Sequence, residues 1–565
     1  MSLLGKQRAA GWTFLAPATI MIAIMSFYPM IRAFIISLQT GAGANMRFAD
    51  PIFSNYKRIL ADKVFQQSIA NTFLYLIIQV PIMLILAILL AQLLNNKDLK
   101  FKGFFRTCVF LPCATSLVSY SLIFRSMFAT DGLINSILIK LGILSTGYNF
   151  LGNSASAKIV IILALIWRWT GYNMVFYLAG LQNIEYSVYE AAKIDGANGW
   201  KTFWKITVPL LKPTIIMTFI MSINGTLQLF DESVNLTKGG PANSTITMSH
   251  YIYNTCFINV PNFGYAAAMS FIIFIMVAVL AFINLKVGDH VTKKNKSAIQ
   301  RRLIPTYIFL IIVSFISVFP LYWMISAATN TSTDVSRGRI IPGSHFMENF
   351  RNLTSQQPLW RALGNSFFYA ILTTVICLLI CSIAGYGFEV YHDKWKDRVF
   401  SILLLAMMVP QVATMVPLFK MFSKAGLLNT AVGFILPIIS TPFMIMMFRQ
   451  NARSFPVDII EAARIDGLNE VRIFFQMFIP TMKSTYAAAA VITFMNAWNS
   501  YLWPKVIMTD NKAMTMPMLI ANLITGYVTD YGMLMCGVLF CSIPTMIVFF
   551  VLQKQFAEGI TGAVK

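Results

Sequence analysis

Side chains able to bind a polar ligand lie within long apolar stretches of the chain. They are Trp169, Tyr172, Asn173 and Tyr177 in one stretch, Asn224 and Gln228 in a second, and Asn496, Trp498 and Asn499 in a third. Amide groups both donate and accept hydrogen bonds, and aromatic faces stack on the apolar faces of sugars. A buried amide without a partner is costly in an apolar medium. These side chains should therefore face a ligand cavity or another helix, and both interpretations are open.

Side chains that could catalyse a reaction or hold a metal are scattered along the chain. The four histidines, His250, His290, His345 and His392, are dispersed, and the seven cysteines show neither paired nor metal-ligand spacing. The chain also lacks a GxxxxGKS/T phosphate-binding loop, an HExxH motif and a GxSxG motif. We therefore expect no catalysis by this chain, and no metal or cofactor held by it.

One polar phrase occurs twice in a chain otherwise dominated by apolar stretches. It reads EAAKIDGANGWKTFWKITVPLLKPT at 190–214 and EAARIDGLNEVRIFFQMFIPTMKST at 461–485, which is 271 residues later and without a gap. Ser187 and Asp458 each stand three residues before the first glutamate of a copy. This is the spacing of a helix N-cap with its reciprocal glutamate. Each copy is therefore predicted to begin a short helix.

Both copies contain a signal that stops the short helix. Asp-Gly pairs occur at 195–196 and 466–467, and glycine readily takes the left-handed conformation that ends helices. An aromatic segment then leads to Pro209 or Pro480 at the start of the next apolar stretch, where a missing N–H is harmless. The product is a helix–turn–helix elbow. Its glutamate either only caps the helix or, since there are two symmetric copies, belongs to a surface that docks a two-fold partner.

The composition places these elements in a lipid bilayer. Hydrophobic residues make up 57% of the chain, charged residues make up 12%, and the mean hydropathy is +0.67. A membrane-spanning helix needs about 20 apolar residues. Twelve stretches fit, at 12–38, 69–94, 104–126, 158–181, 208–232, 265–285, 303–328, 364–389, 399–420, 430–448, 479–504 and 533–552. The predicted fold is an all-α integral membrane protein with twelve transmembrane helices.

Basic residues predict the orientation of the chain, because cationic loops are retained on the cytoplasmic side. With both termini inside, the inner segments carry 24 Lys and Arg in 118 residues, and the outer segments carry 13 in 165. Both repeated elbows then face the cytoplasm. The asymmetry also accounts for much of the net charge of +22, so anionic lipid headgroups are the expected contact and nucleic acid is not.

The duplication extends beyond the repeated phrase. NYKRIL and NTF, at Asn55 and Asn71, match NFRNL and NSF, at Asn349 and Asn365, both at an offset of 294. Two six-helix units of the same orientation should be related by an axis along the membrane normal. The predicted units are 1–285 and 303–565, joined by a basic cytoplasmic linker at 286–302.

These motifs together resemble a known family. EAAKIDGANGWKTFWKITVPLLKP and its second copy resemble the cytoplasmic coupling signature of permease subunits from binding-protein-dependent ABC importers of carbohydrates, a maltose-transporter-like family. Supporting stretches are FLPCATSLVSYSLIFRSMFATDGLIN (110–135), DESVNLTKGGPANST (231–245), RALGNSFF (361–368) and NAWNSYLWP (496–504). The likeness covers nearly the whole chain, but this chain joins two permeases that are normally separate.

The resemblance implies an ATP-driven sugar importer in a bacterial inner membrane. Two separate ATPase subunits would hold ATP and Mg, and an extracytoplasmic sugar-binding protein would deliver a mono- to oligosaccharide to a pathway of alternating access. The coupling residues that it implies are Glu190, Ala191, Ala192, Asp195 and Gly196 in the first half and Glu461, Ala462, Ala463, Asp466 and Gly467 in the second.

A twelve-span, ion-coupled sugar symporter is the main alternative, since such proteins also join two six-helix halves. Ion coupling usually requires ionisable groups inside the membrane. By the predicted boundaries every acidic residue lies in a loop or near a span end, with Asp231 and Glu232 at the outer end of the fifth span. Arg168 and Arg32 are intramembrane, and the sequence assigns no acidic partner to Arg168. The symporter is therefore disfavoured.

Overall fold

The protein is described by a computed structural model that covers residues 3–41, 46–96, 98–182, 184–194, 197–288, 303–453, 455–524 and 529–563. Within these ranges the chain is almost entirely helical. The strands recorded there, β1 (Gln39–Thr40) and β2 (Arg47–Phe48), form a two-residue antiparallel pair. The all-α prediction is confirmed. Most of the predicted linker, from 289 to 302, lies outside the described residues.

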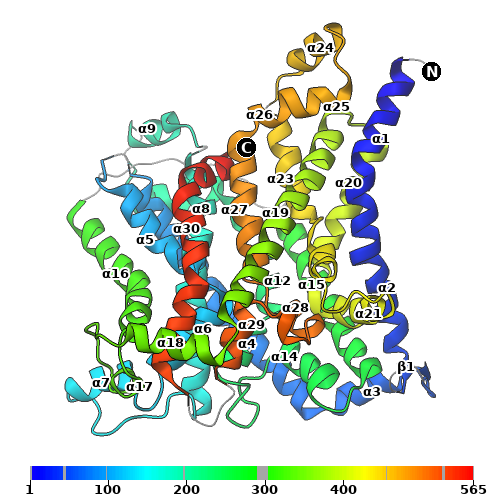
Figure 1. The fold of residues 1–565 in the computed structure, drawn as a ribbon. Coiled ribbons are helices and arrows are strands. Elements are labelled where there is room, and N and C mark those ends of the chain that lie inside the picture. The colour runs from blue at the N-terminus through cyan, green and yellow to red at the C-terminus, as the bar shows by residue number, and fades with distance from the viewer. Residues whose placement is uncertain are drawn as a thin grey trace.

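Eight helical segments among the described residues are long and apolar enough to cross a membrane. In the first half they are α1, η1 and α2 together (Leu3–Ile22, Ala23–Phe27, Tyr28–Ser37), α4 (Lys63–Leu94), α8 (Ser154–Gln182), α12 with α13 (Lys212–Leu227, Asp231–Asn235) and α15 (Phe263–Gly288). In the second half they are α16 (Leu303–Ala328), α19 (Leu359–Val390) and α30 (Tyr531–Ala563). Figure 1 shows these helices running side by side through the bundle.

Three predicted spans are bent rather than straight. They are α5 (Lys102–Ala114) with α6 (Leu117–Met127), α20 and η4 (Lys394–Leu405, Ala406–Met408) with α21 (Gln411–Lys424), and α22 and η5 (Ala431–Ile435, Leu436–Ile438) with α23 (Pro442–Ala452), bent by 95°, 95° and 52°. Val409 and Thr441 are extended because each precedes a proline, which disfavours the helical conformation. Thr115 and Ser116 are extended at the first break.

Counting each bent pair as one span gives up to eleven spans in the described residues, against the twelve predicted. The difference is the stretch 479–504. It forms α26 (Ile479–Thr481), α27 (Lys483–Trp498) and α28 (Leu502–Ile507), and the 16 residues of α27 are about 24 Å long at 1.5 Å per residue. α12 of the first half has the same 16 residues and a matching break before α13, so the stretch 479–504 is the counterpart of the fifth span and supplies the twelfth predicted span.

The structure repeats the duplication element for element around the elbows. The offset of 271 residues relates α12 to α27 from end to end, and it relates the first residues of α13 and α28. The same offset relates α9 (Tyr186–Ile194), α10 (Gly199–Thr202), η2 (Phe203–Thr207) and α11 (Val208–Leu210) to α24 (Val457–Ile465), α25 (Glu470–Ile473), η6 (Phe474–Phe478) and α26. The two halves therefore share one local fold here.

The two halves are interlocked through their first helices. α1 of the first half packs against α19 of the second, and α16 of the second half packs against α5 of the first. The close approach of α1 depends on small residues. A Cβ atom at Gly11 would lie 2.8 Å from Cβ of Tyr391, and one at Gly387 would lie 2.8 Å from Cβ of Phe14. Side chains of both halves also share the two larger hydrophobic clusters of the bundle.

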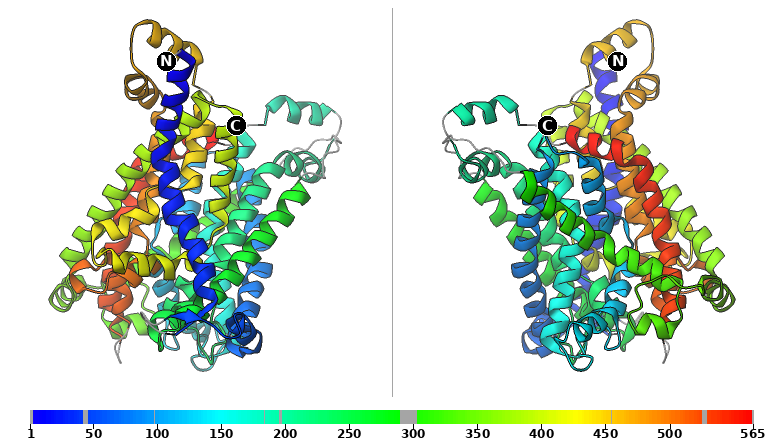
Figure 2. Two further views of the ribbon diagram at one scale, coloured as in Figure 1. Left: turned by 90° about the vertical axis from the view of Figure 1, so that its right-hand side faces the viewer. Right: turned by 90° about the vertical axis from the view of Figure 1, so that its left-hand side faces the viewer.

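The two ends of the bundle differ. In Figure 1 α9 and α24 project at the same end as the ends of the described chain, and the side views of Figure 2 agree. The opposite end carries short helices, which are α3 (Ser54–Ala61), α7 (Leu133–Lys140), α14 (Met248–Tyr253), α17 (Ser332–Ser336), α18 (Phe346–Gln356) and α29 (Met516–Asn522). Along the chain η3 (Asn254–Ile258) directly follows α14, and η7 (Asn511–Ala513) precedes α29. The two elbows thus occupy one face of the molecule.

Candidate functional site

The two elbows begin differently from the prediction. α9 starts at Tyr186 and α24 starts at Val457, so Ser187 and Asp458 are helical residues rather than N-caps. Pro456 occupies the N-cap position of α24 without a side-chain hydrogen bond. The predicted capping box is therefore wrong. Pro456 holds an extended backbone that begins α24, whereas Glu185 stands at the matching position before α9, and Glu190 and Glu461 are both exposed.

The end of the short helix follows the prediction where the structure describes it. Gly467 has a φ of +81°, the left-handed conformation that favours glycine. The N–H of Leu468 donates to the carbonyl of Ala463 at 3.0 Å, and in the first copy Ala197 donates to Ala192 at 3.3 Å. These are matching bonds of the two turns. Asp195 and Gly196 lie outside the described residues.

Each elbow presents a matched apolar tip. Ile194 and Ile465, at the ends of α9 and α24, are 87% and 86% exposed, and Val188 and Ile459 are also exposed. Ala192 and Ala463 are buried beneath them. Isolated exposed apolar residues are ordinary. The same pair at the same position in both halves, on one face of the protein, indicates a surface made for contact.

The second elbow is tied to the bundle by a charged cluster. Arg464 donates to Glu470 at 2.8 and 3.2 Å, and the Tyr391 hydroxyl donates to the same carboxylate. Burial, with the adjacent Glu470 carboxylate, raises the pKa of Tyr391. The matching positions of the first copy are Lys193 and Gly199. Because glycine has no side chain, the first elbow cannot form this ion pair.

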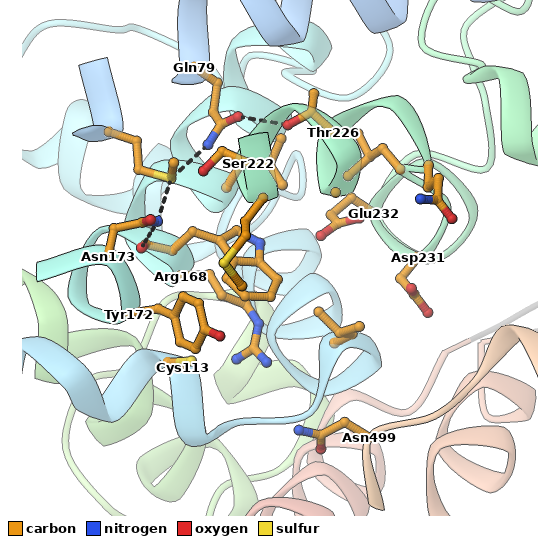
Figure 3. A pocket seen from close by; sticks show the side chains of 18 of the residues that line it. Gln79, Cys113, Arg168, Tyr172, Asn173, Ser222, Thr226, Asp231, Glu232 and Asn499 are labelled. Carbon is orange, nitrogen blue, oxygen red and sulfur yellow. Dashed lines mark hydrogen bonds between the residues drawn. The ribbon is translucent and has the colours of Figure 1, made fainter. Parts of the chain in front are cut away.

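Two adjoining cavities lie in the bundle between the halves. The central cavity, of about 320 Å³, is lined by α4, α5, α6, α8, α12, α13 and α27. The adjoining cavity, of about 300 Å³, is lined by α6, α8, α13, α19, α21, η5, α23, α27 and α28. Residues lining both cavities are Leu117, Arg168, Trp169, Asp231, Asn496 and Asn499. Figure 3 shows several of these side chains around one of the cavities. Both halves contribute to the junction.

The nine predicted ligand-binding residues fall into two groups, those that line the central cavity and those that do not. Those that line the central cavity are Trp169, Tyr172, Asn173, Gln228, Asn496 and Asn499. Tyr177 instead shares a hydrogen bond with Thr218 at 2.6 Å, and Trp498 donates to the carbonyl of Cys541 at 2.9 Å. Asn224 donates to the carbonyl of Met407 at 3.1 Å. The last three side chains therefore make contacts between helices, outside the cavity wall.

Two amides join the halves at the edge of the cavities. Asn224 bonds to the carbonyl of Met407 in η4, and the side-chain oxygen of Gln228 accepts a hydrogen bond from the backbone N–H of Gln411 at 2.7 Å. Gln228 also donates to Asn224 at 2.5 Å. Gln411 is the first residue of α21, so its N–H has no partner within the helix. The amides of the first half thus satisfy backbone groups at a broken span of the second.

Ionisable groups line the central cavity, which the sequence reasoning missed. Asp231 and Glu232 lie in α13, near the end of the span Lys212–Asn235 as predicted, and they also line the cavity. Arg168 in α8 lines it as well and is 3% exposed. The signal was present as one cation and two adjacent acids in apolar segments. Whether they contact the cavity depends on the rotation of each helix about its own axis, and the limits of a span along the sequence do not give that rotation.

Several of these groups have defined partners. Arg168 donates to the carbonyl of Pro112 at 2.7 Å and to the hydroxyl of Thr115 at 3.2 Å, which holds the guanidinium at the break between α5 and α6. Glu232 accepts a hydrogen bond from the Tyr120 hydroxyl. In the part of the chain that the structure describes, no group of three or more His, Cys, Asp or Glu could hold a metal ion. The arrangement is suited to binding a ligand by hydrogen bonds.

Comparison with known proteins identifies the relatives of this chain. Residues 58–289 and 378–562 match the family described as binding-protein-dependent transport system inner membrane component. The lactose transport system permease protein LacF of Rhizobium radiobacter is 50% identical over 275 residues, which are 48% of this chain and 92% of LacF. LacG of the same organism is 40% identical over 271 residues, which are 48% of this chain and 99% of LacG.

A bacterial ABC transporter that imports the acidic polysaccharide alginate has a similar solved structure. Its TM-score is 0.44 and its sequence identity is 23%, over 50% of this chain and 96% of that chain. LacF and LacG each correspond to about half of this chain and to nearly all of their own length. The chain therefore has the combined length of two such proteins.

Proposed function

Because the chain belongs to the family of inner membrane components of binding-protein-dependent transport systems, we propose that it provides both membrane halves of an ATP-driven oligosaccharide importer. Family membership makes it a transport permease of a multi-pass membrane system rather than an enzyme, and it favours ATP-driven import over the ion-coupled symporter. A sugar such as lactose is the proposed substrate, since LacF and LacG are named as lactose permease proteins.

The observation that carries this proposal is the pair of matched elbows on one face of the protein. α9 and α24 are related by the 271-residue offset, and each ends in an isoleucine that is almost fully exposed. Two equivalent tips suit two equivalent partner surfaces. We assign these surfaces to two ATPase subunits, which would hold ATP and Mg. The elbow face would then be cytoplasmic, in agreement with the basic loops of the sequence.

Coupling residues follow from the same proposal. They are Glu190, Ala191, Ala192, Asp195 and Gly196 in the first half, with Glu461, Ala462, Ala463, Asp466 and Gly467 in the second. Closure of the ATPase pair would move both elbows and alternate the access of the cavities between the two sides of a bacterial inner membrane. An extracytoplasmic sugar-binding protein would deliver the sugar at the opposite end, where the short helices gather.

The proposal is tested on the complex of this chain with its ATPase and binding protein, reconstituted in lipid. The double variant Ile194→Ser with Ile465→Ser removes both apolar tips, and Glu190→Ala with Glu461→Ala removes both exposed carboxylates. Since these four side chains are exposed or largely exposed, the chain should still fold. We expect sugar-stimulated ATP hydrolysis to fall at least tenfold in both variants, and the ATPase to co-purify less with the isoleucine variant.

A matched control changes an exposed acid outside both elbows, Asp98→Ala in the loop between α4 and α5, and should leave ATP hydrolysis unchanged. Hydrolysis that stays coupled to sugar in both elbow variants would contradict the docking role. Transport that proceeds without any ATPase would contradict the importer itself and favour the symporter.

A further inference from the structure

Three cations gather where α2 of the first half packs against α21 of the second half, two helices that Figure 1 shows side by side. Arg32 lies in α2, and Lys420 and Lys424 lie four residues apart on one face of α21. Lys420 is half-buried, and its ammonium interacts electrostatically with both other cations. Because like charges repel, an anion lying among the three side chains stabilises such a cluster.

The described part of the protein supplies no such anion. None of the three cations forms an ion pair there. The helices in extensive contact with α2 and α21, which are η1, α14, α15 and α28, contain neither Asp nor Glu, and nor do α2 and α21 themselves. The positive charge at this place is therefore not balanced by a neighbouring carboxylate.

The contacts that the cations do make are weak. The ammonium of Lys420 donates to the thioether sulfur of Met46 and lies over the ring of Phe263, 5.0 Å from its centroid. Lys424 is the last residue of α21, where the helix dipole is equivalent to about half a negative charge. Half a charge balances only part of three positive charges, so a site for an external anion remains.

Arg32 lies at the depth of the lipid headgroups. The span Ala9–Ser37 has 29 residues, which make about 43 Å at 1.5 Å per residue, the thickness of a bilayer with its headgroups. Arg32 precedes the end of this span by about 7 Å, so its long side chain reaches the headgroup layer. Ile31 and Phe34 beside it are 57% and 40% exposed. These apolar side chains offer acyl chains a surface next to the cations.

The anion present at this depth in a bilayer is the phosphate of a phospholipid. A guanidinium binds two phosphate oxygens at once, and an ammonium binds phosphate as a point charge. A zwitterionic headgroup brings its own cation next to the phosphate. A headgroup of net negative charge therefore fits three unbalanced cations better than a zwitterionic one.

We infer that the phosphate of an anionic phospholipid binds among Arg32, Lys420 and Lys424, in the leaflet opposite the elbows. The lipid joins the two halves from the membrane side, because α2 and α21 belong to different halves. It also holds one end of α21, a helix of 14 residues or about 21 Å whose first residue, Gln411, lines the adjoining cavity. The inference is independent of the ligand that the cavities bind and of the ATPase.

The test measures lipid binding to the full chain in neutral detergent by native mass spectrometry. Wild type should bind phosphatidylglycerol at least tenfold more tightly than phosphatidylcholine. Arg32→Gln with Lys424→Gln changes two exposed side chains, so the chain should fold. The affinity for phosphatidylglycerol should then fall about 30-fold, at about fivefold for each cation, with phosphatidylcholine unaffected. A matched control removes two exposed cations elsewhere, Lys140→Gln in α7 with Arg361→Gln in α19, and should match wild type.

A second pair of variants separates charge from packing at the half-buried position. Lys420→Arg keeps the charge and should bind phosphatidylglycerol as wild type does, whereas Lys420→Gln should bind it about fivefold more weakly. In nanodiscs, peptides covering 416–424 should exchange hydrogen more slowly with phosphatidylglycerol than with phosphatidylcholine in wild type, and equally with both lipids in the variant lacking Arg32 and Lys424.

Four results would overturn the inference. They are equal affinity of wild type for the two lipids, unchanged affinity for phosphatidylglycerol in the variant lacking Arg32 and Lys424, equal weakening in the control, and displacement of the lipid by excess inorganic phosphate. The last result would show a site for free anions, because inorganic phosphate has no acyl chains to contact Ile31 and Phe34. If the variant binds lipid normally and loses only its response to the sugar-binding protein, the cations belong to a protein-docking surface instead.

Discussion

The hydrogen bonds that Asn224 and Gln228 make across the halves should act as a latch at the broken span of the second half. Asn224→Leu with Gln228→Leu keeps the side chains similar in size and removes their polar groups. The variant loses the bond of Asn224 to the Met407 carbonyl, at 3.1 Å, and the bond from the Gln411 N–H, at 2.7 Å. The backbone between η4 and α21 then has no support from the first half at these two points.

The size of the effect follows from these two bonds. A hydrogen bond contributes about 0.5–1.5 kcal/mol net, and Gln411 is exposed, so water can replace part of its loss. Taking about 1 kcal/mol for each bond, the joined arrangement loses about 2 kcal/mol. Since RT is about 0.59 kcal/mol, the equilibrium between joined and parted halves at this point should shift about 30-fold.

Hydrogen exchange measured by mass spectrometry reports this opening directly. In nanodiscs, peptides covering 406–415 should exchange up to about 30-fold faster in the double variant than in wild type. The matched control is Asn365→Leu, which removes an amide that bonds to the carbonyls of Lys512 and Met514 within the second half. Unchanged exchange at 406–415 in the double variant, or an equal rise in the control, would refute the latch.

Three further predictions concern the elbow, the outer end and the helix packing. Glu470→Gln should cost about 1 kcal/mol, because the ion pair with Arg464 is about a quarter exposed and partly screened, and limited proteolysis should cut the second elbow faster. Burial lowers the pKa of His250, in α14 outside the spans, from 6.5 to about 4. Below pH 6.5 the histidine of the unfolded chain is protonated, whereas that of the folded chain stays neutral down to about pH 4. The free energy of unfolding should therefore decrease as the pH is lowered from 6.5 to 4, by about 2 kcal/mol at pH 5. Thermal melting between pH 7.5 and 5 should show this fall in wild type and not in His250→Gln. A Cβ at Gly171 would lie 2.0 Å from the carbonyl oxygen of Val109, so Gly171→Ala should reduce the yield of folded protein in size-exclusion chromatography, whereas Gly225→Ala, where no atom lies within 4 Å, should not.

The repeated elbow was predictable because its signals are local. The phrase at 190–214 recurs at 461–485, and the structure repeats the matching elements at the same offset. Gly467 ends its helix as glycine's freedom of φ predicts. The predicted N-cap failed because Ser187 and Asp458 lie inside their helices, which begin at Tyr186 and Val457, two residues earlier than predicted.

The broken spans show the limit of reading hydrophobicity alone. The stretches 399–420 and 430–448 are mostly apolar, so their length and composition predict straight helices. The prolines at 410 and 442 carried a signal that the chain could break, because the residue before a proline avoids the helical conformation. The size of each bend, 95° and 52°, depends on the helices packed around it.

The sequence by itself determined that the chain is a duplicated, helical membrane protein with two elbows, because about 20 apolar residues are enough to cross a bilayer and a repeat is visible without coordinates. Only the tertiary structure decided which polar side chains share a cavity. Asn224 and Trp498 turned toward neighbouring helices, while Asp231 and Arg168 turned toward the space between the halves. A helix that is apolar nearly all round has no marked polar face, so its rotation about its own axis is set by the helices of both halves that pack against it.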